Sequence, residues 1–175
     1  MATQIARRPG SRTRDGAATA PAMKSITVDG TPEECYKAWR NLEAYPRFLS
    51  FVEAVRPHRE DRFHWVARDP AGDRIEWDVD LVEDRAGASL VWRSIPGSDV
   101  EMVGVVTFEK APGGRGTIIR LGLEVAPRTT ALKTLTSRLG DKIRPKHELH
   151  RFKQWFETGE VATAGIRLCG PGSES

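Results

Sequence analysis

From residue 62 to residue 125 the chain alternates apolar and polar side chains, and this pattern predicts a sheet with two unlike faces. Successive side chains of a strand point to opposite faces. One face collects three of the five tryptophans with other apolar or small residues: Phe63, Trp65, Ala67, Ile75, Trp77, Val79, Leu81, Leu90, Trp92 and Ser94. The other face collects titratable residues: His64, Arg68, Glu76, Asp78, Asp80, Arg93, Glu101, Arg120 and Glu124. We therefore expect one aromatic, uncharged face and one solvated face.

Turn residues divide this region into strands. Clusters of Gly, Pro, Asp and Ser occupy 69–72, 84–87, 96–98 and 112–116. The expected strands are 24–28, 51–56, 62–68, 74–83, 88–95, 99–110 and 116–126. Because short turns join neighbouring strands antiparallel, the sheet is predicted to be a meander.

Two short helices are expected between the first and second strands. Thr31 and Glu34 have the spacing of a capping box, and Pro32 suits the first helical position. The helix that follows contains Tyr36 and Trp39, and Pro46 breaks a second helix over 42–49.

After Pro127 the apolar period becomes that of a helix. Leu132, Leu135 and Leu139 form a first stripe, and Leu149, Phe152 and Phe156 form a second within an expected helix over 145–158. This helix is about 21 Å long, so it can lie across strands of about 26 Å. The sequence thus predicts an α+β fold in which an antiparallel sheet of about seven strands curves around a long C-terminal helix.

The distribution of charge excludes a nucleic-acid binder. The chain has 175 residues, enough for one domain, and a net charge of +3. Residues 1–24 contain Arg7, Arg8, Arg12, Arg14 and Lys24 against Asp15, so the excess positive charge lies on a tail and not on the body. We expect a disordered basic tail over 1–23, a domain over 24–162 and a flexible tail over 163–175.

No apolar run approaches the roughly 20 residues that span a bilayer, so no transmembrane segment is expected. Cys35 and Cys169 lie far apart, so neither a disulfide framework nor a zinc site is indicated. A cytoplasmic location is predicted by default.

The order of elements resembles the helix-grip fold of the START-like (SRPBCC) superfamily, which includes polyketide cyclases/dehydrases and coenzyme Q-binding proteins. The residues that carry this resemblance lie between 24 and 162: 26–39, Leu42-x-x-Tyr45-Pro-Arg-Phe48, His64-Trp65, Glu76-Trp-Asp78, Val91-Trp-Arg-Ser94, Gly116-Thr117, Arg151-Phe-Lys153 and Glu157-Thr-Gly-Glu160. The resemblance implies a deep cavity between sheet and long helix that takes lipids, quinones or polyketides.

The candidate cavity residues are those expected to face this space. They are Tyr45, Phe48, Phe63, Trp65, Trp77, Val79, Trp92, Ser94, Met102, Leu121, Leu149, Phe152 and Phe156. The tryptophans can equally be plain core. Polar groups expected inside are Ser94, Thr117, the Tyr45 hydroxyl near the cavity mouth, and the indole N–H groups.

No catalytic residue, metal site or cofactor is assigned. Glu76, Asp78 and Asp80 are interpreted as a solvated ladder that pairs with Arg93 or Arg120. His64 is in phase with this solvated face, and His147 and His150 lie opposite the apolar stripe of the last helix.

The sequence therefore predicts a domain that binds an apolar small molecule such as a lipid, quinone or polyketide, for transport or presentation. The alternative is an aromatase/cyclase that shapes a reactive polyketide chain in the same cavity. A third interpretation is a protein-interaction module whose cavity is filled, which is favoured if the tryptophans collapse onto the helix.

Overall fold

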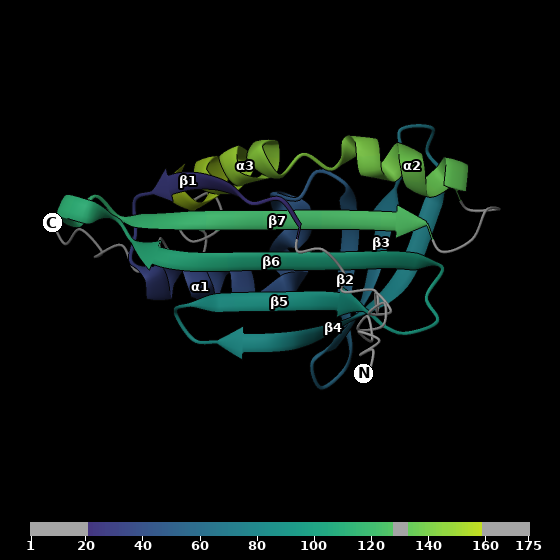
Figure 1. The fold of residues 1–175 in the computed structure, drawn as a ribbon, viewed down its shortest axis with the longest axis horizontal. Helices are drawn as coiled ribbons and strands as arrows, with labels where there is room; N and C mark the ends of the chain where they lie inside the picture. Colours follow the sequence, from purple (N-terminus) through teal and green to yellow (C-terminus); the bar gives the residue numbers. More distant parts are fainter. Residues whose placement is uncertain (1–20, 128–132, 159–175) are drawn as a thin grey trace, which may run out of the picture.

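Seven antiparallel strands form one sheet in the order β1-β7-β6-β5-β4-β3-β2 (Figure 1). The computed structural model describes residues 21–127 and 133–158. The strands are β1 Lys24–Val28, β2 Val52–Arg59, β3 Arg62–Arg68, β4 Arg74–Arg85, β5 Ser89–Ser94, β6 Val100–Lys110 and β7 Thr117–Pro127. The helices are α1 Pro32–Arg40, η1 Leu42–Arg47, η2 Pro112–Gly114, α2 Lys133–Lys142 and α3 Pro145–Thr158. The helix-grip α+β fold is confirmed.

Local sequence signals set the start of α1 and the form of η1. The Thr31 side chain accepts a hydrogen bond from the Glu34 amide at 3.2 Å, and the Glu34 carboxylate accepts one from the Thr31 amide at 2.8 Å, which completes the predicted capping box. The second helix is not a broken α-helix but a single 3-10 helix that contains Pro46. Proline lacks an amide hydrogen and disfavours the α conformation in the residue before it, so the tighter turn is the form that fits.

The two faces of the sheet follow the predicted phase. Trp65, Trp77 and Trp92 are at most 4% exposed. Asp78 and Asp80, which have the opposite phase on β4, are partly exposed. Figure 1 looks onto the outer face of the sheet, with α1 behind it and α3 running along β1 and β7. The core therefore lies between the inner face and these helices.

Gly104 of β6 makes room for Trp92 of β5. The two residues are paired across the strands, and a β-carbon at position 104 would lie 2.1 Å from Cε2 of the indole. Glycine inside a strand is unfavourable by itself and marks a close approach. Here the approaching group is a tryptophan ring that lies over the neighbouring strand.

Parts of the sequence interpretation lie outside the described residues. These include the basic residues of the tail up to position 20, Leu132, Cys169 and the C-terminal tail, and the side chain of Leu135 is not described either. Of the predicted tail, Pro21 is buried and, with Met23, lies against Gly122 on β7. The domain limits and the cytoplasmic location stay predictions. In the described part, no helix is both long and apolar enough to cross a bilayer.

Substitution of Gly104 by alanine tests the close approach of Trp92. The added methyl group must displace the indole, so we expect Gly104→Ala to lower the free energy of unfolding by about 1–3 kcal/mol, measured by chemical denaturation. Gly140→Ala in α2 is the control, because the nearest heavy atom to its new β-carbon, the Val125 carbonyl oxygen, is 3.9 Å away. Equal effects of the two substitutions would contradict the packing.

The pair Trp77 and Asp78 tests the phase of β4. Trp77→Ala removes a side chain that is 4% exposed and should cost about 3–5 kcal/mol of unfolding free energy. Asp78→Asn, at the adjacent position on the solvated face, should change it by no more than about 0.5 kcal/mol at pH 8. If Asp78→Asn is the more costly change in denaturation experiments, the register is wrong.

Candidate functional site

Six aromatic side chains fill the space between the inner face of the sheet and α3. The aromatic cluster consists of Trp39, Tyr45, Phe48, Trp65, Trp92 and Phe152, each of them 0% exposed. Their touching rings have centroids 4.9–6.3 Å apart, and Phe152 of α3 lies 5.0 Å from Trp39 and 5.1 Å from Phe48. In this structure the rings of sheet and helices therefore meet directly.

Four indoles form a continuous row through this region. The rings of Trp39 and Trp92 stack at 6.3 Å and 23°, and those of Trp92 and Trp65 at 6.3 Å and 28°. Trp77 follows Trp65 at 6.0 Å and 35°. The row joins α1 to β5, β3 and β4, so one helix and three strands contribute to a single aromatic surface.

Every tryptophan of the chain buries an indole N–H that has no acceptor in the part of the chain that the structure describes. The atoms are Nε1 of Trp39, Trp65, Trp77, Trp92 and Trp155. An indole nitrogen can only donate, and a buried donor without a partner costs about 1–3 kcal/mol. The region is therefore apolar in surface but rich in unused hydrogen-bond donors.

The sequence analysis expected the Tyr45 hydroxyl near the mouth of a cavity, but the structure places it in the interior. The side chain is fully buried, and the hydroxyl donates to the Trp39 carbonyl oxygen at 2.8 Å. Burial raises the pKa of this phenol, which stays protonated at neutral pH. Tyr45 thus fastens η1 to the end of α1.

The inner hydroxyl groups of Ser94 and Thr117 also have hydrogen-bond partners. The Ser94 hydroxyl oxygen accepts from the Met102 amide at 2.9 Å, and the Thr117 hydroxyl donates to the Gly30 carbonyl at 2.8 Å. Beside Thr117, burial raises the pKa of the Cys35 thiol to about 11. This thiol is therefore protonated at neutral pH and is a poor nucleophile.

Five predicted cavity residues meet in the aromatic cluster, and the others surround it. Trp77, Val79, Met102, Leu121 and Leu149 are buried in the same core, Phe63 is partly buried against it, and Phe156 stacks on Phe152 at 5.4 Å. Ser94 and Met102 also line a hollow at the surface of β4, β5 and β6. That these residues line a ligand cavity stays a prediction.

The sequence analysis missed Trp39, Trp155 and Glu148. Trp39 lies four residues after Cys35, which is the spacing of one helix face, and both side chains are buried. Trp155 follows Phe152 by three residues and contacts its ring at 5.8 Å. Both positions make the apolar stripes of their helices wider than the sequence analysis predicted.

Glu148 is a buried carboxylate that fastens α3 to the start of β2. It accepts hydrogen bonds from the Ser50 amide at 2.7 Å and from the Ser50 hydroxyl at 2.6 Å. One turn later Arg151 donates to the Phe48 carbonyl at 3.3 Å. The helix that covers the aromatic cluster is thus held along its side by polar contacts.

On the outer face the acidic ladder has other partners than expected. His64 contacts Asp78 at 2.9 Å and Glu76 at 3.2 Å. Arg62 binds Asp80 through two hydrogen bonds of 2.6 and 2.9 Å, which lower the pKa of that carboxyl. Asp80 does lie opposite Arg93 across β4 and β5, but its side-chain contact is with Arg62, its partner on β3. The pairing with Arg120 was wrong, because that arginine lies on β7 and binds Glu109 of β6.

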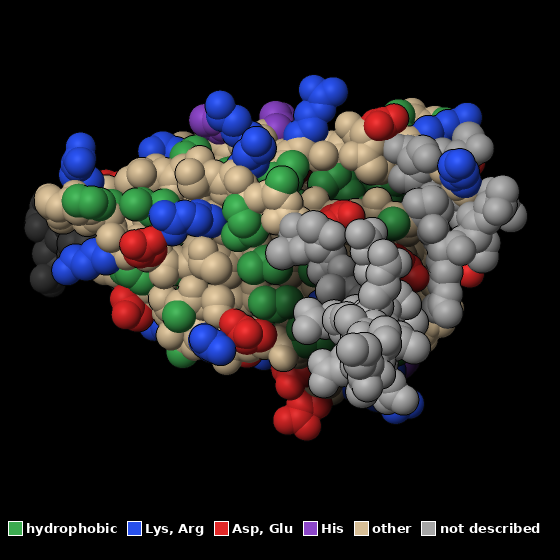
Figure 2. Space-filling view, viewed as in Figure 1, with side chains coloured by type: hydrophobic (Ala, Val, Ile, Leu, Met, Phe, Trp, Pro, Cys, Tyr) green, Lys and Arg blue, Asp and Glu red, His purple; other side chains and the backbone are tan. Residues whose placement is uncertain are grey.

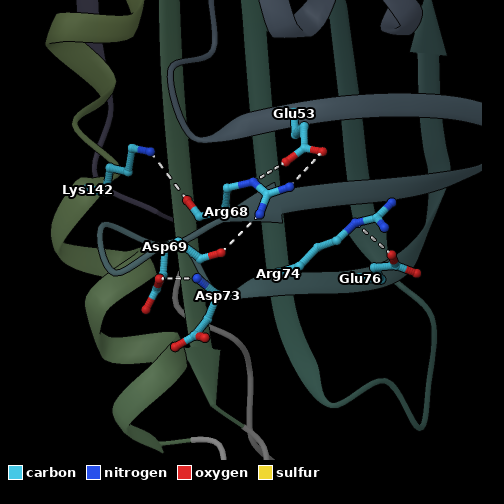
Figure 3. Close-up of polar contacts among 8 residues, drawn as sticks. Glu53, Arg68, Asp69, Asp73, Arg74, Glu76 and Lys142 are labelled. Atoms are coloured by element: carbon cyan, nitrogen blue, oxygen red, sulfur yellow. Dashed lines mark hydrogen bonds and ion pairs between the residues drawn. The ribbon is translucent and has the colours of Figure 1, made fainter.

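The turn between β3 and β4 is tied to its surroundings (Figure 3). The buried Asp69 carboxylate accepts from the Asp73 amide at 2.8 Å, and its other oxygen lies 3.5 Å from Arg138 of α2. Lys142 of α2 donates to the Arg68 carbonyl at 3.3 Å. These contacts fix α2 across one end of the sheet. Among the described residues no group of three or more His, Cys, Asp or Glu side chains is placed to hold a metal ion.

The surface has a hollow of about 450 Å³ on the outer face of β4, β5 and β6. It is lined by Asp80, Val82, Arg93, Ile95, Glu101 and Val103 among others. Three further hollows of about 250–470 Å³ lie elsewhere on the described surface. None of the four is lined by the aromatic cluster.

The chain is similar to proteins from several bacteria. An uncharacterized 17.2 kDa protein of Streptomyces lincolnensis is 28% identical over 149 residues, which cover 82% of this chain and 94% of that protein. The crystal structure of DR_A0006 from Deinococcus radiodurans has a TM-score of 0.64 and 28% identity, covering 78% of this chain and 96% of that one.

A third similar structure is the di-domain ARO/CYC StfQ from the steffimycin biosynthetic pathway. It has a TM-score of 0.57 at 16% identity, and the match covers 83% of this chain and 52% of StfQ. At this identity the likeness concerns the fold alone. The family described as polyketide cyclase/dehydrase and lipid transport matches residues 28–148, more than two thirds of the chain. With the helix-grip fold and the aromatic inner face in place, this match means that the chain belongs to the polyketide cyclase/dehydrase and lipid transport family.

Proposed function

We propose that the domain binds an uncharged, mainly apolar small molecule with hydrogen-bond acceptors between the sheet and α3. Lipids, quinones and polyketides, which carry carbonyl oxygens on an apolar frame, have this chemistry. The observation that carries the proposal is the row of buried indoles whose N–H groups lack an acceptor among the described residues. Apolar walls with a few directed polar groups are typical of small-molecule sites.

The four donors of the indole row carry an energetic cost while they lack acceptors. Each costs about 1–3 kcal/mol while unpartnered, so a ligand oxygen that accepts one of them recovers part of that cost. A plain hydrocarbon core would have no reason to concentrate such donors, because Phe and Leu offer apolar surface without a polar N–H group. The donors therefore favour a ligand that is apolar in shape and carries acceptor atoms.

The ligand is uncharged because the aromatic cluster offers no counter-ion. Its one ionisable group is Tyr45, whose pKa is raised by burial and whose hydroxyl donates a hydrogen bond to the Trp39 carbonyl oxygen. A buried charge without a partner is strongly unfavourable. A carboxylate or ammonium group of a ligand would have to stay at the surface.

Binding requires the aromatic cluster to open. Phe152 stands between α3 and the indole row, and α3 is held at its side by Glu148 and Arg151. A ligand with a flat ring system replaces ring contacts with similar ring contacts, so its entry costs mainly the displacement of Phe152. If no ligand opens the cluster, the interpretation as a protein-interaction module with a filled cavity takes its place.

A matched pair of probes tests this proposal. We expect 2,3-dimethyl-1,4-naphthoquinone, titrated in a calorimeter, to bind more tightly than 2,3-dimethylnaphthalene, which has the same ring frame without acceptors. Trp92→Phe keeps an aromatic ring but removes a donor. It should weaken quinone binding by about two- to tenfold, the equivalent of one neutral hydrogen bond, and leave hydrocarbon binding unchanged.

Two outcomes contradict the proposal. Equal affinity for both probes in the wild type would mean that the indole donors do not recognise the ligand. If a protein with intact near-ultraviolet circular dichroism binds neither probe, the proposed ligand site does not exist. Thermal unfolding of Trp92→Phe shows whether the variant is folded before the affinities are compared.

The second candidate is an aromatase/cyclase, supported by the family description and by the likeness in fold to StfQ. The aromatic cluster would then shape a reactive chain, since it holds no acid–base pair. Incubation with a linear poly-β-keto thioester should give the same cyclised products for the wild type and for His64→Ala or Asp78→Asn. Loss of turnover with binding intact in either variant would place catalysis on the outer face and overturn the binding proposal.

A further inference from the structure

The two α-helices that carry aromatic cluster residues, α1 and α3, have opposite orders of charge along their axes. α1 begins with Glu33 and Glu34 and ends with Lys37 and Arg40, which suits the helix dipole. In α3 no basic residue lies in the last turn, and the only acidic residue of the first turn, Glu148, is buried and bonded to Ser50. The exposed charges near the start of α3 are cations, where the dipole disfavours them.

Three of these basic residues and two neighbouring histidines form a surface that we call the basic ridge: Arg144, Lys146, His147, His150 and Arg151. The first four are exposed, and Arg151 is half-buried where it donates to the Phe48 carbonyl. The side chains of Arg144, Lys146 and His150 have no ion-pair partner among the described residues, and His147 lies 3.7 Å from Glu148. Figure 2 shows basic and histidine side chains gathered along the edge of the molecule where α3 runs.

A sequence that breaks a local rule without a gain in folding points to function at that place. We infer that the basic ridge docks the domain on an anionic lipid bilayer. The ridge lies on the solvent side of the helix that covers the aromatic cluster, so docking would bring α3 against the membrane surface. The inference goes beyond the proposed function and does not depend on which ligand is bound.

The choice of a bilayer over an acidic protein follows from what the ridge lacks. Stable protein interfaces centre on buried aromatic or apolar anchors. In the described part of the chain the exposed large apolar side chains are Met23 and Val82, and neither lies on α3. Adsorption to anionic lipids needs no such anchor, because each Lys or Arg near the surface contributes by itself.

Vesicle sedimentation with the full chain tests this inference. We expect the protein to bind vesicles of phosphatidylcholine with about 30% phosphatidylglycerol at about 25 mM salt, and not vesicles of phosphatidylcholine alone. Arg144→Gln/Lys146→Gln should reduce the partition coefficient about 25-fold, since one basic residue is worth about fivefold. Binding should fall steeply towards about 0.5 M salt, because salt screening limits the electrostatic attraction to short distances.

The matched control is Arg56→Gln/Arg59→Gln on β2. Both arginines are exposed, neither has an ion-pair partner in the described part, and the change in net charge is the same. The partition coefficient of this variant should fall no more than about twofold. Its changed charges lie on β2, at the other edge of the sheet from β1, which α3 contacts. The basic residues of 1–24 are present in all variants, so the difference between the two pairs reports on the ridge.

Equal losses in the two double variants, or equal binding to both vesicle types, would overturn the inference. Soluble polyglutamate separates the remaining alternative. If the wild type binds polyglutamate through Arg144 and Lys146 but does not bind anionic vesicles, the ridge serves an acidic protein and the bilayer is excluded. Because no ligand is added, failure of this experiment leaves the ligand-binding proposal untouched.

Discussion

The close approach of the Trp92 indole to Gly104 is the contact on which the interior depends. Without a side chain at position 104, the ring lies over β6 and reaches Trp39, Tyr45 and Trp65. These contacts join α1 and η1 to the sheet, and Phe152 then places α3 against the same rings through Trp39. A β-carbon at that one position would force the ring to move and would disturb the ring contacts between these layers.

The same packing creates a cost that the fold must carry. Burying an indole gains area, about 150–250 Å² for an aromatic side chain, but its N–H loses water. The gain at about 25 cal/mol per Å² exceeds the 1–3 kcal/mol cost of an unpartnered donor, so the cluster is stable without a ligand. A stable interior that still holds free donors is suited to reversible binding, since the protein need not unfold when the ligand leaves.

The sequence predicted what depends on period and on local hydrogen bonds. Alternation placed Trp77 inside and Asp78 outside, and Thr31 with Glu34 marked the start of α1. It could not predict what depends on neighbours distant in the chain. The pairing of Asp80 with Arg62 requires the strand register, and the burial of Glu148 requires Ser50, 98 residues away. The direct contact of the six rings in the aromatic cluster depends on side-chain packing, which no period encodes.

The titratable side chains of β3 and β4 and the indole N–H donors lie on opposite faces of the sheet. This separation favours binding over proton transfer. General acids and bases must lie within hydrogen-bond reach of the reacting atoms. His64 contacts Asp78 and Arg62 binds Asp80 on the outer side, while the aromatic cluster on the inner side presents indole donors and a phenol held protonated. Indoles can orient a carbonyl but cannot exchange protons with it at neutral pH. Any reaction inside this domain would therefore depend on the shape imposed on its substrate.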